Sequence, residues 1–342
     1  MTGLFATRLF RIALALAGAY NLAFGIWAGF WPQKFFELFE LEPPRYPEIW
    51  ACLGMVVGVY GLLYWHAAWK PEQGKPIVTV GLIGKVLGPI GMALSISDRW
   101  PARLAMICVF NDAIWWLPFG LFLLRGTAIG KRLAAMGPWC CIVIHALALA
   151  SMGLWLQHGT QAVAEPADRA AYILAHRVAW SIGWILWMAS AASLVGFYAW
   201  WGSRLKYPTL ATACVILTAL GSVCDFTGES LWAFVLPEKA MQSVYDSYWN
   251  SNAFTTIDAA STMLTAGVAN LLYSIAGIGL TLATRKLPRV MLAIVWIAWL
   301  AGIGMTMAAM IQWVGGLILT TVLLFPALLV FIAWMALRWR QE

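Results

Sequence analysis

Long apolar stretches dominate this chain, and polar residues gather in short segments between them. A run of roughly 20 apolar residues is long enough to cross a bilayer core as a helix. Membrane strands need only about ten residues of alternating polarity, a pattern these runs do not follow. We therefore predict an all-α integral membrane protein with about ten transmembrane helices, near residues 10–31, 48–69, 76–96, 101–124, 138–158, 178–200, 208–236, 254–283, 288–312 and 314–338.

Composition supports the same class of protein. Of 342 residues, 62% are hydrophobic and 11% are charged, whereas a soluble globular chain carries about 25% charged residues. Proline fits the first turn of a helix because the N–H that it lacks would have no partner there. We therefore expect helices to begin near the prolines that stand at or near the starts of these runs: Pro71, Pro101, Pro138, Pro208 and Pro288.

The distribution of charge predicts the orientation of the helices. With the N-terminus inside, 14 of the 22 Lys and Arg residues fall in inner segments and 7 in outer segments, as the positive-inside rule requires. This places both termini on the cytoplasmic side, and we expect a multi-pass protein of a bacterial inner (plasma) membrane. The first apolar run continues unbroken to Trp31, which predicts an uncleaved first helix and not a signal peptide.

The basic segment 125–132 divides the chain into a predicted four-helix block, residues 1–130, and a six-helix block, residues 131–342. In the first block, the glycine-rich stretches 54–61 and 81–91 and the segment 110–119 (FNDAIWWLPF) resemble small four-helix DoxX-like bacterial membrane proteins. The resemblance implies a four-helix transmembrane fold and brings no settled function. The peroxide-reducing activity attributed to some relatives needs an exposed reactive cysteine, and all six cysteines here lie in apolar runs. Residues 131–342 show no such resemblance.

Two ionisable residues fall near the middle of the membrane in the first block. A charge at this depth costs about 3 kcal/mol on insertion scales, so each needs a partner or a function. Lys85 and Asp112 lie on consecutive helices at similar depth, which predicts an ion pair between them. Pro89 should leave the carbonyl of Lys85 without its helical donor. With Asn111 and Trp115 nearby, the pair would either bind a ligand or a proton, or lock two helices together.

A second group of ionisable residues is predicted in the outer half of the membrane. Asp225 and Glu229 are four residues apart and so share one face of a helix, and Asp258 begins the next helix at similar depth. Two carboxylates one turn apart in a low dielectric cannot both ionise cheaply unless a cation neutralises them. We expect Arg177 to be that cation and the neighbouring His176 to exchange protons.

These residues favour a protein that binds a small lipophilic molecule in an outer-half cavity and transforms it by acid–base chemistry, as an isomerase or cyclase would. Asp225 or Glu229 would be the general acid or base, and an apolar wall would come from Trp180, Trp184 and Trp232. Two alternatives stay open: a proton- or ion-coupled transporter, and an accessory subunit of a membrane complex.

The expected partners are the lipid bilayer and the lipophile, with a membrane-protein partner or a second copy left open. Nucleic acid is not an expected partner, because the net charge of +7 is spread over the inner segments. Four scattered histidines predict no metal site, and the sequence assigns no cofactor.

Overall fold

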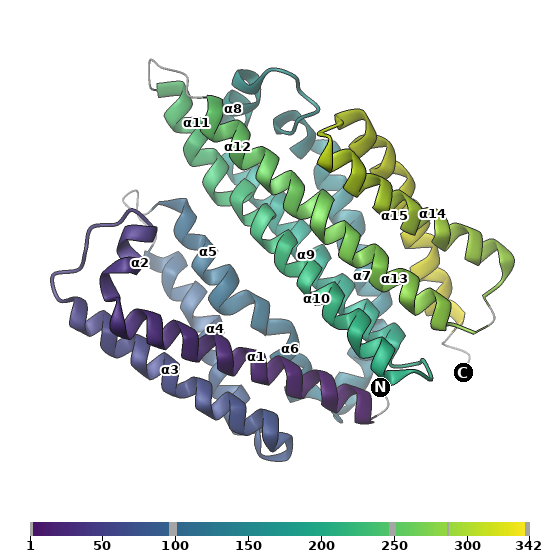
Figure 1. Ribbon diagram of the computed structural model, residues 1–342, viewed down its shortest axis with the longest axis horizontal. Helices are drawn as coiled ribbons and strands as arrows, with labels where there is room; N and C mark the ends of the chain where they lie inside the picture. Colours follow the sequence, from purple (N-terminus) through teal and green to yellow (C-terminus); the bar gives the residue numbers. More distant parts are fainter. Residues whose placement is uncertain (1–2, 96–100, 246–250, 286, 339–342) are drawn as a thin grey trace. The chain divides into compact units, whose positions relative to one another are not determined.

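A computed structural model describes residues 3–95, 101–245, 251–285 and 287–338 of the chain (Figure 1). Within these ranges the regular structure is entirely helical, and ten helical segments are long and apolar enough to cross a membrane. The predicted all-α, multi-pass class and the number of helices are confirmed. The two chain ends that we predict to be cytoplasmic lie outside the described residues.

The contacts between helices divide the chain into two compact units, an N-terminal unit (Thr2–Lys131) and a C-terminal unit (Arg132–Glu342). The division falls inside the basic segment that separates the two predicted blocks. Each unit is described by itself below.

In the described part of the N-terminal unit, four segments are long and apolar enough to span a membrane. They are α1 (Gly3–Phe30), α3 (Pro47–Trp69), α4 (Lys75–Ser95), and a segment made of α5 (Ala105–Ile107), η3 (Cys108–Ala113) and α6 (Ile114–Leu124), while the short helix α2 (Pro32–Leu38) follows α1. Helix α1 packs along α3 because glycines meet there: a Cβ on Gly25 would lie 2.5 Å from the Cα of Gly58. Small residues at such crossings let two backbones approach closely in a membrane.

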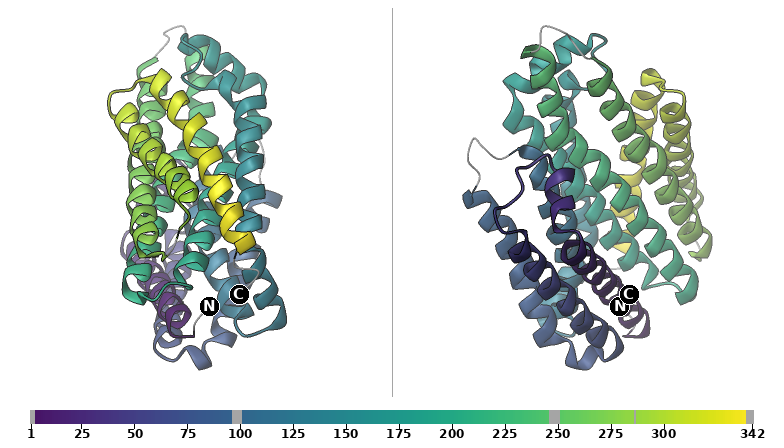
Figure 2. Two further views of the ribbon diagram at one scale, coloured as in Figure 1. Left: turned by 90° about the vertical axis from the view of Figure 1, so that its right-hand side faces the viewer. Right: turned by 60° about the vertical axis from the view of Figure 1, so that its left-hand side comes forward.

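In the described part of the C-terminal unit, six segments are long and apolar enough to span a membrane, and the short helix α8 lies between the first two. In chain order its elements are α7 (Ala128–Leu154), η4 (Leu156–Gly159), α8 (Pro166–Ala175), α9 (Arg177–Gly202), α10 (Pro208–Ser230), η5 (Leu231–Val235), α11 (Leu236–Tyr245), α12 (Ser251–Thr262), η6 (Met263–Ala269), α13 (Asn270–Ala283), α14 (Arg289–Met310) and α15 (Val314–Arg338). Helix α10 packs against α9, η6 and α13, and α14 packs between α13 and α15. Figure 2 shows α14 and α15 side by side at the end of the colour scale.

One predicted helix start is wrong. Pro138 lies inside α7, which begins at Ala128. A proline inside a helix removes one backbone hydrogen bond, and membrane helices tolerate this where other groups satisfy the freed carbonyl. Pro208 and Pro288 do stand at helix starts, at the first residue of α10 and immediately before α14.

Three of the membrane-spanning segments contain a π-helical turn, and each turn lies beside buried ionisable residues. These turns are η3, η5 and η6. A π turn widens the helix and leaves a carbonyl outside the regular ladder, and such turns are frequent at functional sites. In a membrane that carbonyl needs another donor. Side chains provide one in every case, as described below.

Candidate functional site

A cavity of about 460 Å³ lies within the C-terminal unit, between α7, α9, α10, the segment from α12 to α13, α14 and α15. Most of its wall is apolar, with a few polar groups that converge on the interior, which is the usual make-up of a small-molecule site. The apolar wall includes Leu149, Met152, Trp184, Met305, Leu317 and Phe325. The polar groups include Gln161, Asp225, Glu229, Asp258, Asn270 and Tyr273. The cavity therefore gathers the three acidic residues that the sequence assigns to this region.

Asp225 is held by a tyrosine from a neighbouring helix. The hydroxyl of Tyr273 donates to Asp225 Oδ2 at 2.6 Å and also lies 3.2 Å from the hydroxyl of Ser222. Gly221, four residues before Asp225 and on the same face of α10, allows this approach: a Cβ there would lie 2.6 Å from the Tyr273 ring. The short hydroxyl–carboxylate distance is typical of a charge-assisted or proton-sharing hydrogen bond.

Glu229 stands one turn further along α10 and is 3% exposed. Its Oε2 atom is buried and has no hydrogen-bond partner among the described residues. No Lys or Arg of the described part of the chain lines the cavity, so none of the described cations of the wall neutralises Asp225 and Glu229. Two carboxyl groups one turn apart without a cation favour a state in which they share a proton.

Asp258 has a different environment, because its charge is compensated. Arg169 donates to Asp258 Oδ2 at 2.6 Å, and both side chains are buried. The same carboxylate accepts hydrogen bonds from the side-chain amide of Gln161 at 2.9 Å and from Trp232 Nε1 at 2.8 Å. A buried ion pair with this many hydrogen bonds satisfies the conditions under which burial of two charges is tolerated. Asp258 is therefore a fixed part of the wall.

The prediction that Arg177 neutralises these acids is wrong, because its side chain does not reach them. Arg177 and His176 are exposed and are not among the residues that line the cavity. His176 stacks on Tyr172, with ring centroids 4.2 Å apart. The reason is that α8 ends and α9 begins at this point, which leaves both side chains outside the bundle, while Arg169 on α8 points inward.

Of the three tryptophans that the sequence assigns to the wall, two line the cavity and one lies behind them. Trp184 and Trp232 line it and stack on each other, with ring centroids 4.1 Å apart. Trp180 is buried but does not line the cavity; its Nε1 donates to the carbonyl of Trp232 at 2.7 Å, and Ser181 donates to the carbonyl of Ala233 at 2.8 Å. Both carbonyls belong to η5, so α9 satisfies the groups that this π turn frees.

Side chains also donate to the carbonyls of the turn η6, which lines the cavity as well. Thr306 of α14 donates to the carbonyl of Gly267 at 2.9 Å, and the side-chain amide of Asn270 donates to the carbonyl of Thr265 at 3.1 Å. His145 of α7 also lines the cavity; its Nδ1 lies 2.9 Å from the carbonyl of Cys141, one turn earlier. That spacing places the N–H on Nδ1 and leaves Nε2 as an acceptor.

The predicted ion pair of the N-terminal unit is replaced by an indirect arrangement. Lys85 and Asp112 are both buried, but the described contacts contain no direct ion pair between them. The Lys85 ammonium donates to the carbonyl of Asn111, a carbonyl in the π turn η3, and the Asn111 amide donates to Asp112 Oδ1 at 2.8 Å. Lys85 also lies over the Trp115 ring, 5.9 Å from its centroid. In the π turn η3, the Asn111 carbonyl accepts the hydrogen bond from the Lys85 ammonium in place of the Asp112 carboxylate.

Pro89 leaves the carbonyl of Lys85 without its backbone donor, as the sequence predicts. Proline removes the donor that the carbonyl of Lys85 would have in a regular helix. Trp116 Nε1 donates to that carbonyl at 3.0 Å, so a side chain of α6 replaces the lost backbone bond. This contact joins α4 to α6 independently of any charge.

Three important residues of the C-terminal site were not found from sequence. Arg169 lies on the buried face of α8 with Ala170 and Ile173, and helical periodicity over the predicted outer segment would have indicated that face. Tyr273 lies in a long apolar helix, and Gln161 in a loop. Nothing in their local sequence distinguishes either from an ordinary interfacial or packing residue.

Comparisons of the chain with models of known protein families, with curated proteins and with solved structures find no match. What the fold and the site define is therefore a class: a multi-pass helical membrane protein with an acid-containing cavity in its C-terminal unit. The likeness of the N-terminal unit to DoxX-like proteins stays a prediction.

Proposed function

We propose that the C-terminal unit binds a small lipophilic molecule in its cavity and transforms it by proton transfer. The observation that carries this proposal is the combination of a largely apolar cavity of about 460 Å³ with the unpartnered Oε2 atom of Glu229. A buried polar atom without a partner costs about 1–3 kcal/mol. A bound molecule with a hydroxyl or carbonyl group would remove that cost.

The exposure of the wall supports a ligand that arrives from the bilayer. Ile318 and Val322 of α15 line the cavity and are also 52% and 62% exposed. These residues therefore mark a place where the cavity reaches the apolar outer surface of α15. A membrane-dissolved molecule would pass here without crossing a polar layer, which favours a lipophile over an ion.

The paired carboxyl groups support proton transfer within the cavity. In an isomerisation, Glu229 as the acid would add a proton to one carbon of an alkene, and the Asp225 carboxylate would remove a proton from a neighbouring carbon. The pair ends with the same number of protons, so no oxidant or second substrate is needed. The stacked rings of Trp184 and Trp232 would stabilise positive charge that develops between the two steps.

The binding part of the proposal can be tested by filling the cavity. Thr321 lines the cavity, whereas Leu319, two residues earlier on α15, is 55% exposed and does not line it. We expect the wild-type chain, purified in mild detergent, to carry a defined lipophile that solvent extraction and mass spectrometry identify. Thr321→Trp should lose this molecule and Leu319→Trp should retain it. Equal retention in both variants would refute binding in this cavity.

The chemical part needs a separate variant. Glu229→Gln keeps the size of the side chain and removes its acidity, so we expect the lipophile to stay bound while its conversion falls by about 10²–10⁴-fold, the usual contribution of a general acid or base. Glu165→Gln, at an exposed acid outside the cavity, is the control. Full activity of Glu229→Gln and of Asp225→Asn would exclude the mechanism. Proton flux in liposomes that is lost in Asp112→Asn would instead favour the transporter.

A further inference from the structure

His145 of α7 lies in the wall of the large cavity and has no role in the proton transfer proposed for Asp225 and Glu229. The side chain is 3% exposed, and all its hydrogen bonds among the described residues involve Nδ1. The N–H on Nδ1 donates to the carbonyl of Cys141, so Nε2 has no proton and is an acceptor. A buried acceptor in the wall of a cavity indicates a donor on the molecule that fills it.

A hydrogen-bond donor lies on the same part of the wall. Trp187 of α9 lines the cavity, and its Nε1 atom is buried without a hydrogen-bond partner among the described residues. The rings of His145 and Trp187 both pack against Phe325 of α15, with centroids 6.1 Å and 5.3 Å from the centroid of that ring. Three helices therefore bring one acceptor and one donor to a single aromatic cluster.

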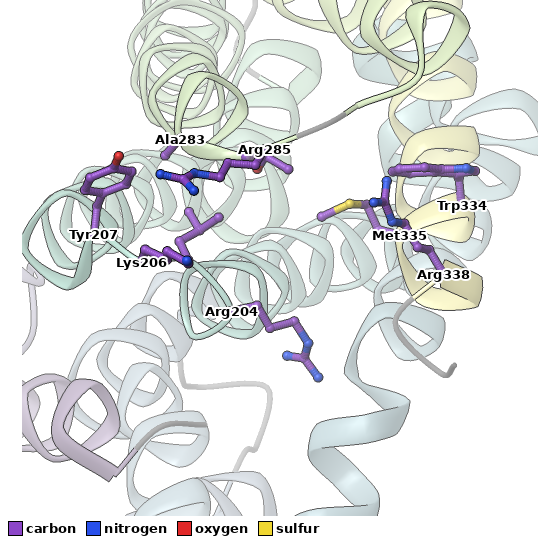
Figure 3. A pocket seen from close by; sticks show the side chains of 10 residues that line it. Arg204, Lys206, Tyr207, Ala283, Arg285, Trp334, Met335 and Arg338 are labelled. Carbon is purple, nitrogen blue, oxygen red and sulfur yellow. The ribbon is translucent and has the colours of Figure 1, made fainter. Parts of the chain in front are cut away.

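The ligand group that suits this cluster is neutral. Basic side chains line a different, smaller pocket of about 170 Å³, and Figure 3 shows Arg204, Lys206, Arg285 and Arg338 around it. None of the residues that line this pocket also lines the large cavity, and no Lys or Arg of the described residues does so. An anionic group beside His145 and Trp187 would therefore be buried without a described cation, which is strongly unfavourable.

Hydrogen-bonding capacity narrows the choice further. A carbonyl group has no proton to donate to Nε2 of His145, and an ammonium group has no lone pair to accept from Nε1 of Trp187. A hydroxyl group both donates and accepts. A hydroxyl placed at Glu229 alone would leave the other two buried atoms without partners, and each such atom is destabilising.

We propose that His145 and Trp187 bind the hydroxyl group of an unsaturated alcohol. The hydroxyl donates to His145 Nε2 and accepts from Trp187 Nε1, and the hydrocarbon body extends along the apolar wall. Asp225 and Glu229 lie on α10, a different helix from both, so the hydroxyl orients the molecule while the double bond is left for the acids. This inference rests on the function proposed above and specifies the chemical class of its lipophile.

The test compares three probes with the same unsaturated body: farnesol, its methyl ether, which has no O–H donor, and farnesene, which has no oxygen. Saturation binding of each radiolabelled probe is measured on the full chain purified in mild detergent. We expect the wild type to bind farnesol about fivefold more tightly than the ether, and the ether about fivefold more tightly than farnesene, since each step removes one hydrogen bond.

Two variants assign these differences to their residues. His145→Phe keeps a ring and removes the acceptor, so farnesol and its ether should bind equally. Trp187→Phe removes the donor, so the ether and farnesene should bind equally while farnesol stays preferred. The controls are His158→Phe and Trp313→Phe, at exposed residues that do not line the cavity, and they should keep both preferences. Unchanged binding of farnesene shows that a variant retains the cavity.

The outcomes separate this inference from the function on which it rests. Equal binding of all three probes by the wild type, and its loss in Thr321→Trp, would overturn the role of His145 and Trp187 and leave the cavity as a lipophile site. This result decides the matter even if the two variants do not fold. Loss of the preference for farnesol in His158→Phe as well would show that His145 is not its source. A wild type that binds none of the probes would contradict both proposals.

Discussion

Buried charged residues have different partners in the two units. In the N-terminal unit, Lys85 and Asp112 are connected through Asn111, so a cation and an acid lie within one network. In the C-terminal unit, Asp225 and Glu229 face a cavity whose wall contains no Lys or Arg among the residues that the structure describes. Each unit keeps a buried atom without a described partner, Asn111 Oδ1 in the first and Glu229 Oε2 in the second, but only Glu229 also faces a large cavity, where a ligand would explain it. The comparison therefore favours the C-terminal unit as the binding site.

The π turns also differ in what they support in the two units. Side chains of α4, α9 and α14 donate to carbonyls in η3, η5 and η6 respectively, so all three turns are locked by neighbouring helices. In the C-terminal unit the two turns contribute Trp232 and Thr265 to the wall of the cavity. We infer that a rigid frame surrounds the acids, which is what proton transfer at a fixed distance requires.

The largest effect is expected from the ion pair that belongs to the frame. Arg169→Leu leaves the Asp258 carboxylate buried without its cation, and removal of one partner of a buried pair costs about 3–5 kcal/mol. Arg177→Leu, at the exposed arginine, should change the free energy of unfolding by less than about 0.5 kcal/mol. Denaturant unfolding in detergent measures both. Similar values for the two variants would contradict the assignment of Arg169 as the cation that compensates Asp258, and a larger loss in Arg177→Leu would restore the residue expected from sequence.

That choice between two arginines illustrates what the sequence can and cannot predict. Apolar run length determines the helices, because a bilayer of fixed thickness demands it, and the four-residue spacing of Asp225 and Glu229 places both in one cavity wall. The cation was misassigned because depth along the chain does not say which way a side chain points at a helix junction. The partner of Asp225, Tyr273, is 48 residues away, and a contact at that separation depends on how helices pack.

A smaller loss of stability is expected in the N-terminal unit. Lys85→Met removes the donor to the carbonyl of Asn111, and an unsatisfied buried acceptor costs about 1–3 kcal/mol. Lys75→Met, at an exposed residue of the same helix, is the control and should have little effect. If Lys85 formed a direct ion pair with Asp112, Asp112→Asn would restore most of the stability lost in Lys85→Met. In the indirect arrangement the double variant should stay destabilised, because Asn111 still lacks its donor.

The smallest effect concerns the hydrogen bond between α4 and α6 that Trp116 donates to the carbonyl of Lys85, which involves no charged group. Trp116→Phe removes the donor to the carbonyl of Lys85 and should cost about 1 kcal/mol, the net value of one hydrogen bond. Pro89→Ala supplies a backbone N–H one turn away, which can donate to the same carbonyl. We therefore expect Pro89→Ala to restore most of the free energy of unfolding that Trp116→Phe removes. In the wild type, the same substitution should change the free energy of unfolding by less. Additive effects in this double-mutant cycle would mean that the two donors do not compete for one acceptor. Trp116 would then not be the replacement for the backbone bond that Pro89 removes, and the N-terminal cluster would again be a candidate for a second site.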